Sequence, residues 1–331
     1  KQIEQEMRSA GGIISLHDME NYKAVIREPV EFDYKGYRVI SAALPSSGGV
    51  LLNQMMKMVE KKNISALGFQ TAESVQLMVE IERRAYADRA YFLGDADFIK
   101  VPVKTLVSHN YLQQRMNDYI PGKAGSSNIT GSGKIYESEE TTHISIIDNE
   151  GNAVAVTTTL NDSYGSRVVV SGAGFILNNQ MDDFSIKEGY PNLYGAVGNA
   201  ANAIAANKRM LSSMTPSIVL KNNQPYIIAG SPGGTTITTT VFQTLLNILE
   251  FGLSPEDAVN KPKFHHQWLP DIIHTESSFP VSVTDQLKQM GYTVTPRLPI
   301  GRTELIVVNK SHAKKITAIA DSRGDDDAEG Y

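Results

Sequence analysis

Two adjacent threonines, Thr141 and Thr142, open a segment that the sequence predicts to be a β-hairpin. The run reads EETTHISIIDNEGNAVAV, and its turn residues DNEG end in a glycine suited to the left-handed conformation. This turn places Asp148 opposite Asn152, so counting back along both strands sets Thr141 directly across from Thr159. Two hydroxyl groups would therefore lie side by side where the hairpin begins.

The alternation of side chains along a strand separates the two threonines. Thr142 shares a face with Ile144, whereas Thr141 shares a polar face with His143. One explanation of the pair is β propensity alone, because threonines favour strands. The other is nucleophilic catalysis. If the Glu140–Thr141 peptide were cut, the free α-amine of Thr141 would have a pKa of about 7.7–8 and would serve as the base for its own hydroxyl.

The composition excludes several classes of function. The chain has 331 residues, of which 41% are hydrophobic and 20% charged, enough for one large core or two domains. A net charge of -5 gives no basic surface for nucleic acid. No apolar run reaches the roughly 18 residues that a membrane helix needs. The absence of cysteine excludes disulfides and thiol catalysis. The first residues, KQIEQEMRSAGG, resemble the end of a helix within a protein, so we expect a partial chain.

The predicted elements change in character along the chain. The first part is mainly helical, and the part after residue 141 is mainly strands. Helices are predicted over 17–28, after the PSSGG turn to about 62, from Thr71 onward, over 109–118, near 236–250 and over 255–260. Hairpins are predicted over 31–42, 143–159, 217–230 and 304–321, with a glycine-bent strand over 167–179. Hairpins with segregated helices predict an α+β class with antiparallel sheets.

Several long motifs together resemble one known family. From residue 141 the chain contains, in order, TTHISIIDNEGNAVAVTTTLN, FILNNQMDDFS, NKRMLSSMTPSIV, GSPGG and FHHQWLPD. These segments closely resemble the gamma-glutamyltransferases, also called gamma-glutamyltranspeptidases or glutathione hydrolases. Upstream, LPSSGG and RAYADRAYFLGDADFIKVP resemble the end of that family's large subunit. The resemblance implies the four-layer αββα fold of N-terminal-nucleophile hydrolases, with the N-terminal part of the large subunit absent.

The resemblance also implies how the chain is divided. Members of this family are precursors that cut themselves before a threonine. Residues 1–140 would then be the C-terminal part of the large subunit, and residues 141–331 the whole small, catalytic subunit. The polar run over about 121–140 is long for a loop inside a domain, so we predict a flexible linker that ends at the cleavage site, Glu140–Thr141.

Transferred position by position, the resemblance makes Thr141 the nucleophile and Thr159 its hydrogen-bond partner, which agrees with the predicted hairpin register. Gly233 and Gly234 would form an oxyanion hole, because their backbone N–H groups are not screened by side chains. The local pattern of this glycine pair also fits a plain strand-to-helix turn. Tyr194 would lie on a lid loop over the bound glutamyl group.

Five other residues would bind the α-carbon substituents of the substrate. Asn161, Gln180 and Asp183 would hold the α-ammonium, which needs acceptors and a negative partner once it leaves water. Ser212 and Ser213 would contact the α-carboxylate through hydroxyl and backbone donors. Seen alone, Asp183 would be an acidic residue in a turn, and the serine pair would belong to a loop or to a helix cap. The interpretation therefore depends on all the motifs occurring together in order.

The reaction implied by the resemblance is γ-glutamyl transfer or hydrolysis. Thr141 would attack the γ-amide of glutathione or another γ-glutamyl compound, and the γ-glutamyl-enzyme would pass its acyl group to water or to an amino acid or dipeptide acceptor. The implied assembly is a heterodimer of large and small subunits from one precursor, without cofactor, nucleic acid or membrane span. The implied location is periplasmic or secreted.

The sequence leaves two alternatives open. One is a cephalosporin or glutaryl acylase on the same scaffold, although its substrates lack the ammonium that Asp183 would pair with. The other is an inactive, uncleaved fragment acting as a non-catalytic domain, because the family's carboxylate-pairing arginine comes from the absent part of the large subunit. No arginine of this sequence has that role by its motif. The adjacent His265 and His266 predict no metal site, since neighbouring side chains of an extended chain point to opposite sides.

Overall fold

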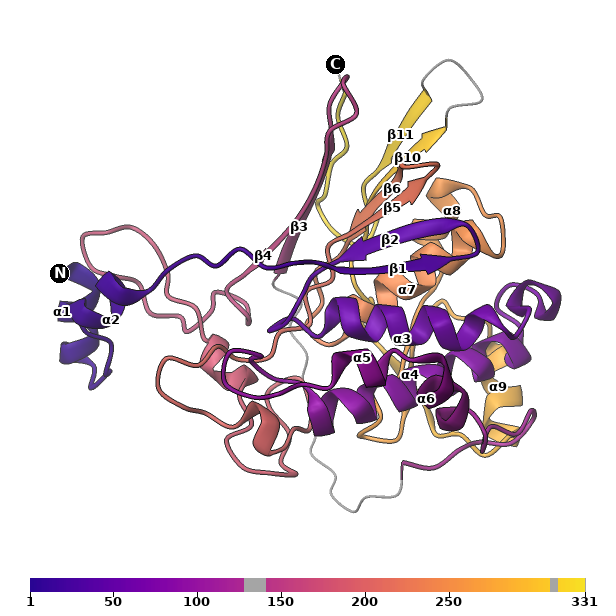
Figure 1. The fold of residues 1–331 in the computed structure, drawn as a ribbon, viewed down its shortest axis with the longest axis horizontal. Helices are drawn as coiled ribbons and strands as arrows, with labels where there is room; N and C mark the ends of the chain where they lie inside the picture. The colour runs from indigo at the N-terminus through magenta and orange to yellow at the C-terminus, as the bar shows by residue number, and fades with distance from the viewer. Residues whose placement is uncertain (128–140, 310–314, 331) are drawn as a thin grey trace.

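The computed structural model describes residues 1–127, 141–309 and 315–330. Its largest sheet has six antiparallel strands in the order β1-β2-β5-β6-β10-β11 (Figure 1). These strands are β1 (Val30–Tyr34), β2 (Tyr37–Ser41), β5 (Ser217–Lys221), β6 (Gln224–Gly230), β10 (Glu304–Asn309) and β11 (Lys315–Ile319). The sheet confirms three predicted hairpins. Asn222 and Asn223 have φ of 52° and 56°, as the tight turn between β5 and β6 requires.

Helices cover one face of this sheet. α3 (Gly48–Glu60) packs against β1 and β2, while α8 (Pro255–Asn260) packs against β10 and β11. α7 (Thr236–Leu249) contacts α3 and follows directly from the end of β6. The main hydrophobic core fills the space between this helical layer and the sheet, and it includes Val50 and Phe242, both fully buried.

Helix α4 (Ala72–Phe92) lies inside the helical layer, between α3 and α9 (Val281–Gln289) (Figure 1). Thr71 caps it, as predicted, by accepting a hydrogen bond from Ser74 N–H at 3.2 Å. A charged helix face is usually solvated or ion-paired. The charged face of α4 is instead largely buried, since 18 of the 21 residues of the helix are buried. Several of its charges form ion pairs, among them Arg84 with Glu80, because a buried charge without a partner is costly.

Residues 121–127 are bound to α4 rather than loose, which corrects the first part of the predicted linker. Gly122 N–H donates to Gln76 Oε1 at 2.8 Å, and Gly125 N–H donates to Glu80 Oε1 at 2.9 Å. The segment therefore satisfies buried acceptors of the helix. Residues 128–140, including Glu140 and the predicted cleavage site, lie outside the described residues.

A second, two-stranded sheet packs on the other face of the large sheet. It consists of β3 (Thr141–Ile147) and β4 (Ala153–Thr159), and β3 contacts β6 and β10 (Figure 1). The pairing of Thr141 with Thr159 confirms the predicted register. The polar face of the hairpin points inward, and the ring of His143 lies against Gly230, where an added Cβ would come within 2.1 Å of it.

The other face of this hairpin is apolar and solvent-exposed in the described part of the chain: Ile144, Ile146, Val154 and Val156 keep 43–51% of their surface accessible. The helices, the large sheet and this hairpin thus stack as three layers, one of helices followed by two of β-strands. They confirm the predicted α+β class and the stacked antiparallel sheets of the αββα arrangement, with no described helix covering the outer face of the hairpin.

A third sheet was not predicted. It joins β7 (Phe264–His265), β8 (Ile273–Glu276) and β9 (Val294–Arg297). β8 and β9 pair in parallel, which departs from the prediction of antiparallel sheets only. The reason is the intervening helix α9, because a crossover helix returns the chain to the same end of the sheet.

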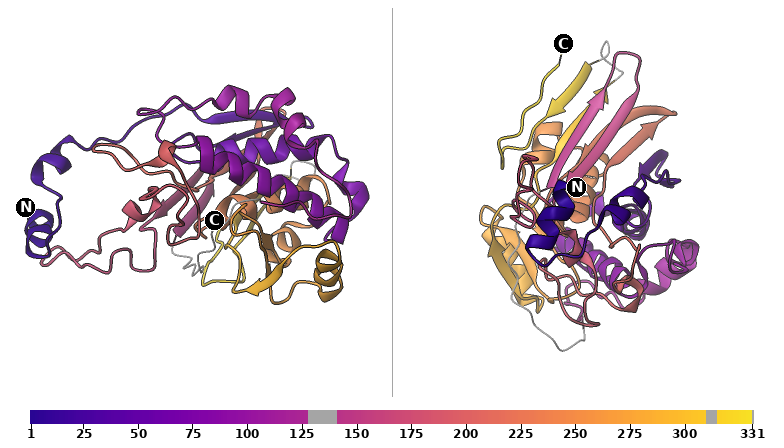
Figure 2. Two further views of the ribbon diagram at one scale, coloured as in Figure 1. Left: turned by 90° about the horizontal axis from the view of Figure 1, so that it is seen from below. Right: turned by 90° about the vertical axis from the view of Figure 1, so that its left-hand side faces the viewer.

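Two predicted elements are wrong. The helix predicted over 17–28 is only α2 (Leu16–Asn21), after which the chain runs extended to β1. Val25 and Ile26 are exposed, so no packing face stabilises a longer helix there. The strand predicted over 167–179 contains only one isolated β-bridge. Figure 2 shows α1 (Gln2–Ser9) and α2 set apart from the sheets, with a loop of the second half of the chain reaching toward them.

Candidate active site

Thr141 begins strand β3 in a buried position and is only 5% exposed. Its hydroxyl donates to Thr159 Oγ1 at 3.0 Å. Thr159 Oγ1 also accepts from the backbone N–H of Asn161 at 2.8 Å, so the acceptor is fixed on two sides. The hairpin register brings the two threonines together, and the bend at Asn161, with φ of 80°, turns the chain away after β4. This pair is the centre of the candidate site.

Gly233 and Gly234 lie between the end of β6 and the first turn of α7. Their φ values of 129° and 53° fall in the region that favours glycine. Within the described chain their N–H groups donate to no acceptor, and the positive end of the α7 dipole lies at the same place. The loop is therefore built to present unpaired backbone donors, as an oxyanion hole requires.

A second loop supports the glycine loop from behind. Arg302 N–H donates to Ser231 Oγ at 2.9 Å, two residues before Gly233. Gly301 packs so closely that an added Cβ would come within 2.7 Å of Ser231 Oγ. The contact between the two loops leaves no room for movement of either backbone toward the other.

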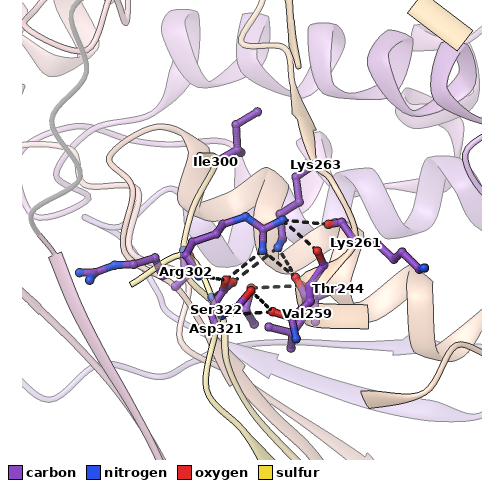
Figure 3. Close-up of polar contacts among 12 residues, drawn as sticks. Thr244, Val259, Lys261, Lys263, Ile300, Arg302, Asp321 and Ser322 are labelled. Atoms are coloured by element: carbon purple, nitrogen blue, oxygen red, sulfur yellow. Dashed lines mark hydrogen bonds and ion pairs between the residues drawn. The ribbon is translucent and has the colours of Figure 1, made fainter. Parts of the chain in front are cut away.

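A buried ionic cluster fixes this supporting loop to the C-terminal segment (Figure 3). Arg323 donates to both carboxylate oxygens of Glu276 at 2.6 and 2.7 Å, and to Asp321 Oδ1 at 2.9 Å. Glu276 Oε1 in turn accepts from the backbone N–H of Ile300 at 2.8 Å. Lys263 lies beside Asp321 at 3.6 Å, and burial lowers the pKa of its ammonium to about 8. The C-terminal segment thereby holds Glu276, which holds the loop at residues 300–302, and that loop supports the glycine loop.

Ser212 and Ser213 are held by the LPSSGG motif, which is far away in sequence. Ser47 donates to Ser212 O through both its N–H and its Oγ, each at 2.8 Å. Gly48 lies so close to this segment that an added Cβ would come within 2.4 Å of Met214 O. The glycine therefore allows the two backbones to touch, and this contact sets the position of both serines.

Asp183 ends a short 3-10 helix (Gln180–Asp183), and it lines the same cavity as the serine pair. The serine pair and Asp183 are called the two walls of the site below. Burial raises the pKa of its carboxyl to about 7, against the opposing effect of Arg89, and Asp182 raises it further. Asn192 Nδ2 donates to Asp183 Oδ1 at 3.4 Å. A carboxyl whose charge is only partly compensated by the protein is suited to pair with a ligand cation.

Tyr194 also lines the cavity and is 2% exposed. Its hydroxyl donates to Asn161 O, and its ring packs on Gly234, where an added Cβ would come within 2.7 Å of Cδ1. Its backbone carbonyl accepts from Gln267 Nε2 at 3.0 Å. The cavity beside Thr141 has a volume of about 20 Å³ in this arrangement, room for about one water. Entry of a larger ligand therefore requires the segment that carries Tyr194 to move.

The structure brings most of the predicted residues to one cavity. Its lining contains eight of them: Thr141, Thr159, Asn161, Asp183, Tyr194, Ser212, Ser213 and Gly234. Gly233 and Gln180 do not line it in this arrangement. Five lining residues were not predicted: Arg89, Asn192, Met214, Thr235 and Ile237. Two of them lie in motifs of the family resemblance, Arg89 in RAYADR and Met214 in SSMTP.

The histidine pair has structural partners. His265 bonds Thr239 Oγ1 at 2.8 Å through Nδ1, and His266 bonds Asp271 Oδ1 at 3.2 Å through Nε2. Burial lowers the pKa of both imidazoles. In the described part of the chain no group of three or more metal-ligating side chains comes together. No described helix is both long and apolar enough to cross a membrane.

Comparison with known proteins places these features in a family. A family model described as gamma-glutamyltranspeptidase matches residues 1–331. The glutathione hydrolase proenzyme of Escherichia coli (strain K12) is 45% identical over 310 residues, which are 93% of this chain and 53% of that protein. The acylase ACY 1 proenzyme of Pseudomonas sp. (strain SE83) is 32% identical over 300 residues, 89% of this chain and 51% of that protein.

A solved structure agrees with this likeness. A mutant gamma-glutamyltranspeptidase chain from Helicobacter pylori is 50% identical with a TM-score of 0.54, and the match covers 55% of this chain and 100% of that chain. The present chain spans about half the length of the curated relatives it matches. On the match over its whole length and on these relatives, the chain belongs to the gamma-glutamyltranspeptidase family.

Proposed function

We propose that the protein carrying this chain transfers or hydrolyses γ-glutamyl groups, with Thr141 as nucleophile. The observation that carries the proposal is the cavity itself. It joins a strand-initial threonine hydroxyl, hydrogen-bonded to a fixed partner at 3.0 Å, with a glycine loop, an acid and a serine pair. Glutathione and other γ-glutamyl compounds are the donors that suit this set of groups. Water, an amino acid or a dipeptide would be the acceptor.

The chemistry follows from the positions of these groups. Thr141 Oγ adds to the γ-carbonyl carbon, and its proton passes to the α-amine of the same residue, which is free once the preceding peptide is cut. The carbonyl oxygen becomes an oxyanion that the N–H groups of Gly233 and Gly234 stabilise. Collapse breaks the amide bond, and the leaving amine takes the proton. Water or an acceptor amine then attacks the ester by the same steps in reverse.

Recognition of the γ-glutamyl group divides between the two walls. The carboxylate of Asp183 pairs with the α-ammonium, with oxygen acceptors from Asn161 and, after the Tyr194 segment moves, from Gln180. Ser212 and Ser213, on the other wall, offer donors to the α-carboxylate. A γ-glutamyl donor carries both groups on one carbon, so it can bridge the walls while its γ-amide reaches the threonine.

We further propose that cleavage at Glu140–Thr141 divides the chain into residues 1–140 and 141–331. The pieces would stay together, because β2 of the first pairs with β5 of the second along five residue pairs. The packing of α3 on α7 crosses the same boundary. A periplasmic or secreted location is proposed with it, since the chain is similar to bacterial proenzymes such as that of Escherichia coli.

An acylase acting on glutaryl compounds is the second candidate, favoured by the similarity to the Pseudomonas acylase. Asp183 argues against it. A glutaryl substrate has no ammonium at this carbon, so the acid would lose a partner and would repel the substrate carboxylate. Comparison of γ-glutamyl and glutaryl anilides on the same preparation decides between the two, because each candidate predicts preference for a different substrate.

The test of the nucleophile uses the complete protein that contains this chain. Thr141→Ala is expected to abolish turnover of a chromogenic γ-glutamyl anilide, and the mass spectrum should show the Glu140–Thr141 bond intact. Thr142→Ala is the matched control: its side chain is exposed on the other face of β3, so both activity and cleavage should persist. Undiminished turnover by Thr141→Ala would remove the basis of the proposal.

A further inference from the structure

The guanidinium of Arg89 lies at the base of the Thr141 cavity. Arg89 belongs to the last part of α4, and only 6% of its surface is exposed. It lines the cavity with Thr141 and Ser213, and it also lines the adjoining hollow beside Asp183 and Asn192. One buried cation therefore borders both walls of the candidate site.

Arg89 has only neutral hydrogen-bond partners. Its Nε donates to Ser47 Oγ at 3.1 Å, and its Nη2 donates to Ser213 Oγ at 3.2 Å. Among the described residues no carboxylate lies within ion-pair distance of it. On the same helix Arg84 pairs with Glu80 at 2.5 Å, as a buried arginine normally does.

An unpaired buried charge is unfavourable, because the protein interior does not replace the hydration that the charge loses. Burial lowers the pKa of Arg89, but an arginine still carries its charge at neutral pH. Asp183 is close enough to interact with it electrostatically without forming a pair. The positive charge is therefore available to an anion that enters the cavity.

The bond to Ser213 also sets the direction of that hydroxyl. A guanidinium can only donate, so Ser213 Oγ is the acceptor and keeps its own hydrogen to give. No described residue accepts that hydrogen. Ser212 is arranged alike, since its Oγ accepts from Met214 N–H at 3.2 Å. Both hydroxyls thus have a lone pair occupied and an O–H group free for an anion in the cavity.

The same guanidinium controls the backbone of the serine pair through Ser47. Ser47 Oγ accepts from Arg89 and donates to Ser212 O, which forms a chain of hydrogen bonds from the helix to the wall of the site. Hydrogen bonds in such a chain polarise one another. Loss of the arginine would remove the donor to Ser213 Oγ and the donor to Ser47 Oγ together.

We propose that Arg89 is a positioning residue of the α-carboxylate subsite: it orients the Ser213 hydroxyl toward the substrate and polarises it through a charge-assisted hydrogen bond. This inference rests on the proposed γ-glutamyl function and deepens it. It assigns specificity for donors that carry an α-carboxylate to a residue of the first 140. Arg89 acts through Ser213 and Ser47 and takes no part in bond making.

The test compares two donors on the complete protein. One is γ-glutamyl anilide, and the other is 4-aminobutyryl anilide, which keeps the amine and lacks the carboxylate. The measured quantity is the ratio of kcat/KM for the two donors. Arg89→Gln is expected to lower this ratio by about tenfold or more, mainly through KM, because a charge-assisted interaction is lost. Arg89→Lys keeps the charge and should recover part of the ratio.

Arg83→Gln is the matched control, since Arg83 is a buried arginine of the same helix that is ion-paired to Asp271 away from the cavity. It should lower stability and leave the ratio unchanged. An unchanged ratio in Arg89→Gln would overturn the inference. Failure of both Arg89 variants to give cleaved subunits, with Arg83→Gln cleaved, would overturn it too, because it would assign Arg89 to folding. A wild-type protein that prefers glutaryl anilide would instead refute the proposed function itself.

Discussion

Replacing Gly234 by alanine tests whether the glycine loop and Tyr194 act as one unit. The added Cβ would lie 2.7 Å from Tyr194 Cδ1 and 2.9 Å from Cε1, both too short for carbon atoms. The ring must move by several tenths of an ångström or more, because the backbone of the loop is held from behind. Its hydroxyl would then lose the bond to Asn161 O, worth about 0.5–1.5 kcal/mol.

The substitution has a second cost that is separate from the clash. Gly234 has φ of 53°, and alanine in this left-handed region costs about 1–2 kcal/mol. Gly252 has φ of 64° with no neighbouring atom within 4 Å of an added Cβ. Gly252→Ala therefore carries only the cost of placing alanine in the left-handed conformation, without a clash, and serves as the matched control.

The assay measures thermal unfolding and kcat for a γ-glutamyl anilide on both variants of the complete protein. Gly252→Ala should lower stability by about 1–2 kcal/mol and leave kcat unchanged. Gly234→Ala should lower stability by about a further 0.5–1.5 kcal/mol, because Tyr194 loses its hydrogen bond to Asn161 O. Its kcat should also fall, because the displaced Tyr194 ring no longer packs on the glycine loop beside Thr141. Equal stability and equal kcat in the two variants would refute the coupling of Tyr194 to the loop.

Two more predictions concern charge. Burial raises the pKa of Asp183 to about 7, and in the proposed function it is the ionised form that would pair with the α-ammonium. KM for a γ-glutamyl donor should therefore rise as pH falls below 7. Asp183→Asn should give a high KM with no such dependence, and a flat wild-type profile over pH 5.5–8.5 would contradict the assignment. Arg323→Met leaves the buried carboxylate of Glu276 without its cation and Asp321 with Lys263 as its remaining ion-pair partner, so urea unfolding should show a loss of about 3–5 kcal/mol. Arg38→Met, at an exposed pair with Glu31, should change stability by less than about 1 kcal/mol.

The central pair of the site was predictable because it is local. Thr141 and Thr159 belong to one hairpin, so the turn and the period-2 alternation of side chains set their register without knowledge of the rest of the fold. The glycine loop was predictable for a similar reason: a strand, two glycines and a helix follow one another directly. The assignment of substrate contacts came from the family resemblance and depended on motifs that occur together in order.

Only the tertiary structure determined which buried residues and long-range contacts support these motifs. In the sequence, Arg89 is one of several charged residues on the polar face of a predicted helix. In the structure, neighbouring elements cover α4, so Arg89 becomes a buried cation that donates to Ser213. Likewise Ser47 and Ser212 are 165 positions apart, and the packing of Gly48 brings them into contact. Local sequence sets hydrogen-bond register and turns, because these depend on neighbouring residues. Burial and long-range contacts depend on how separate elements pack, and they determine which charges remain unpaired in the cavity.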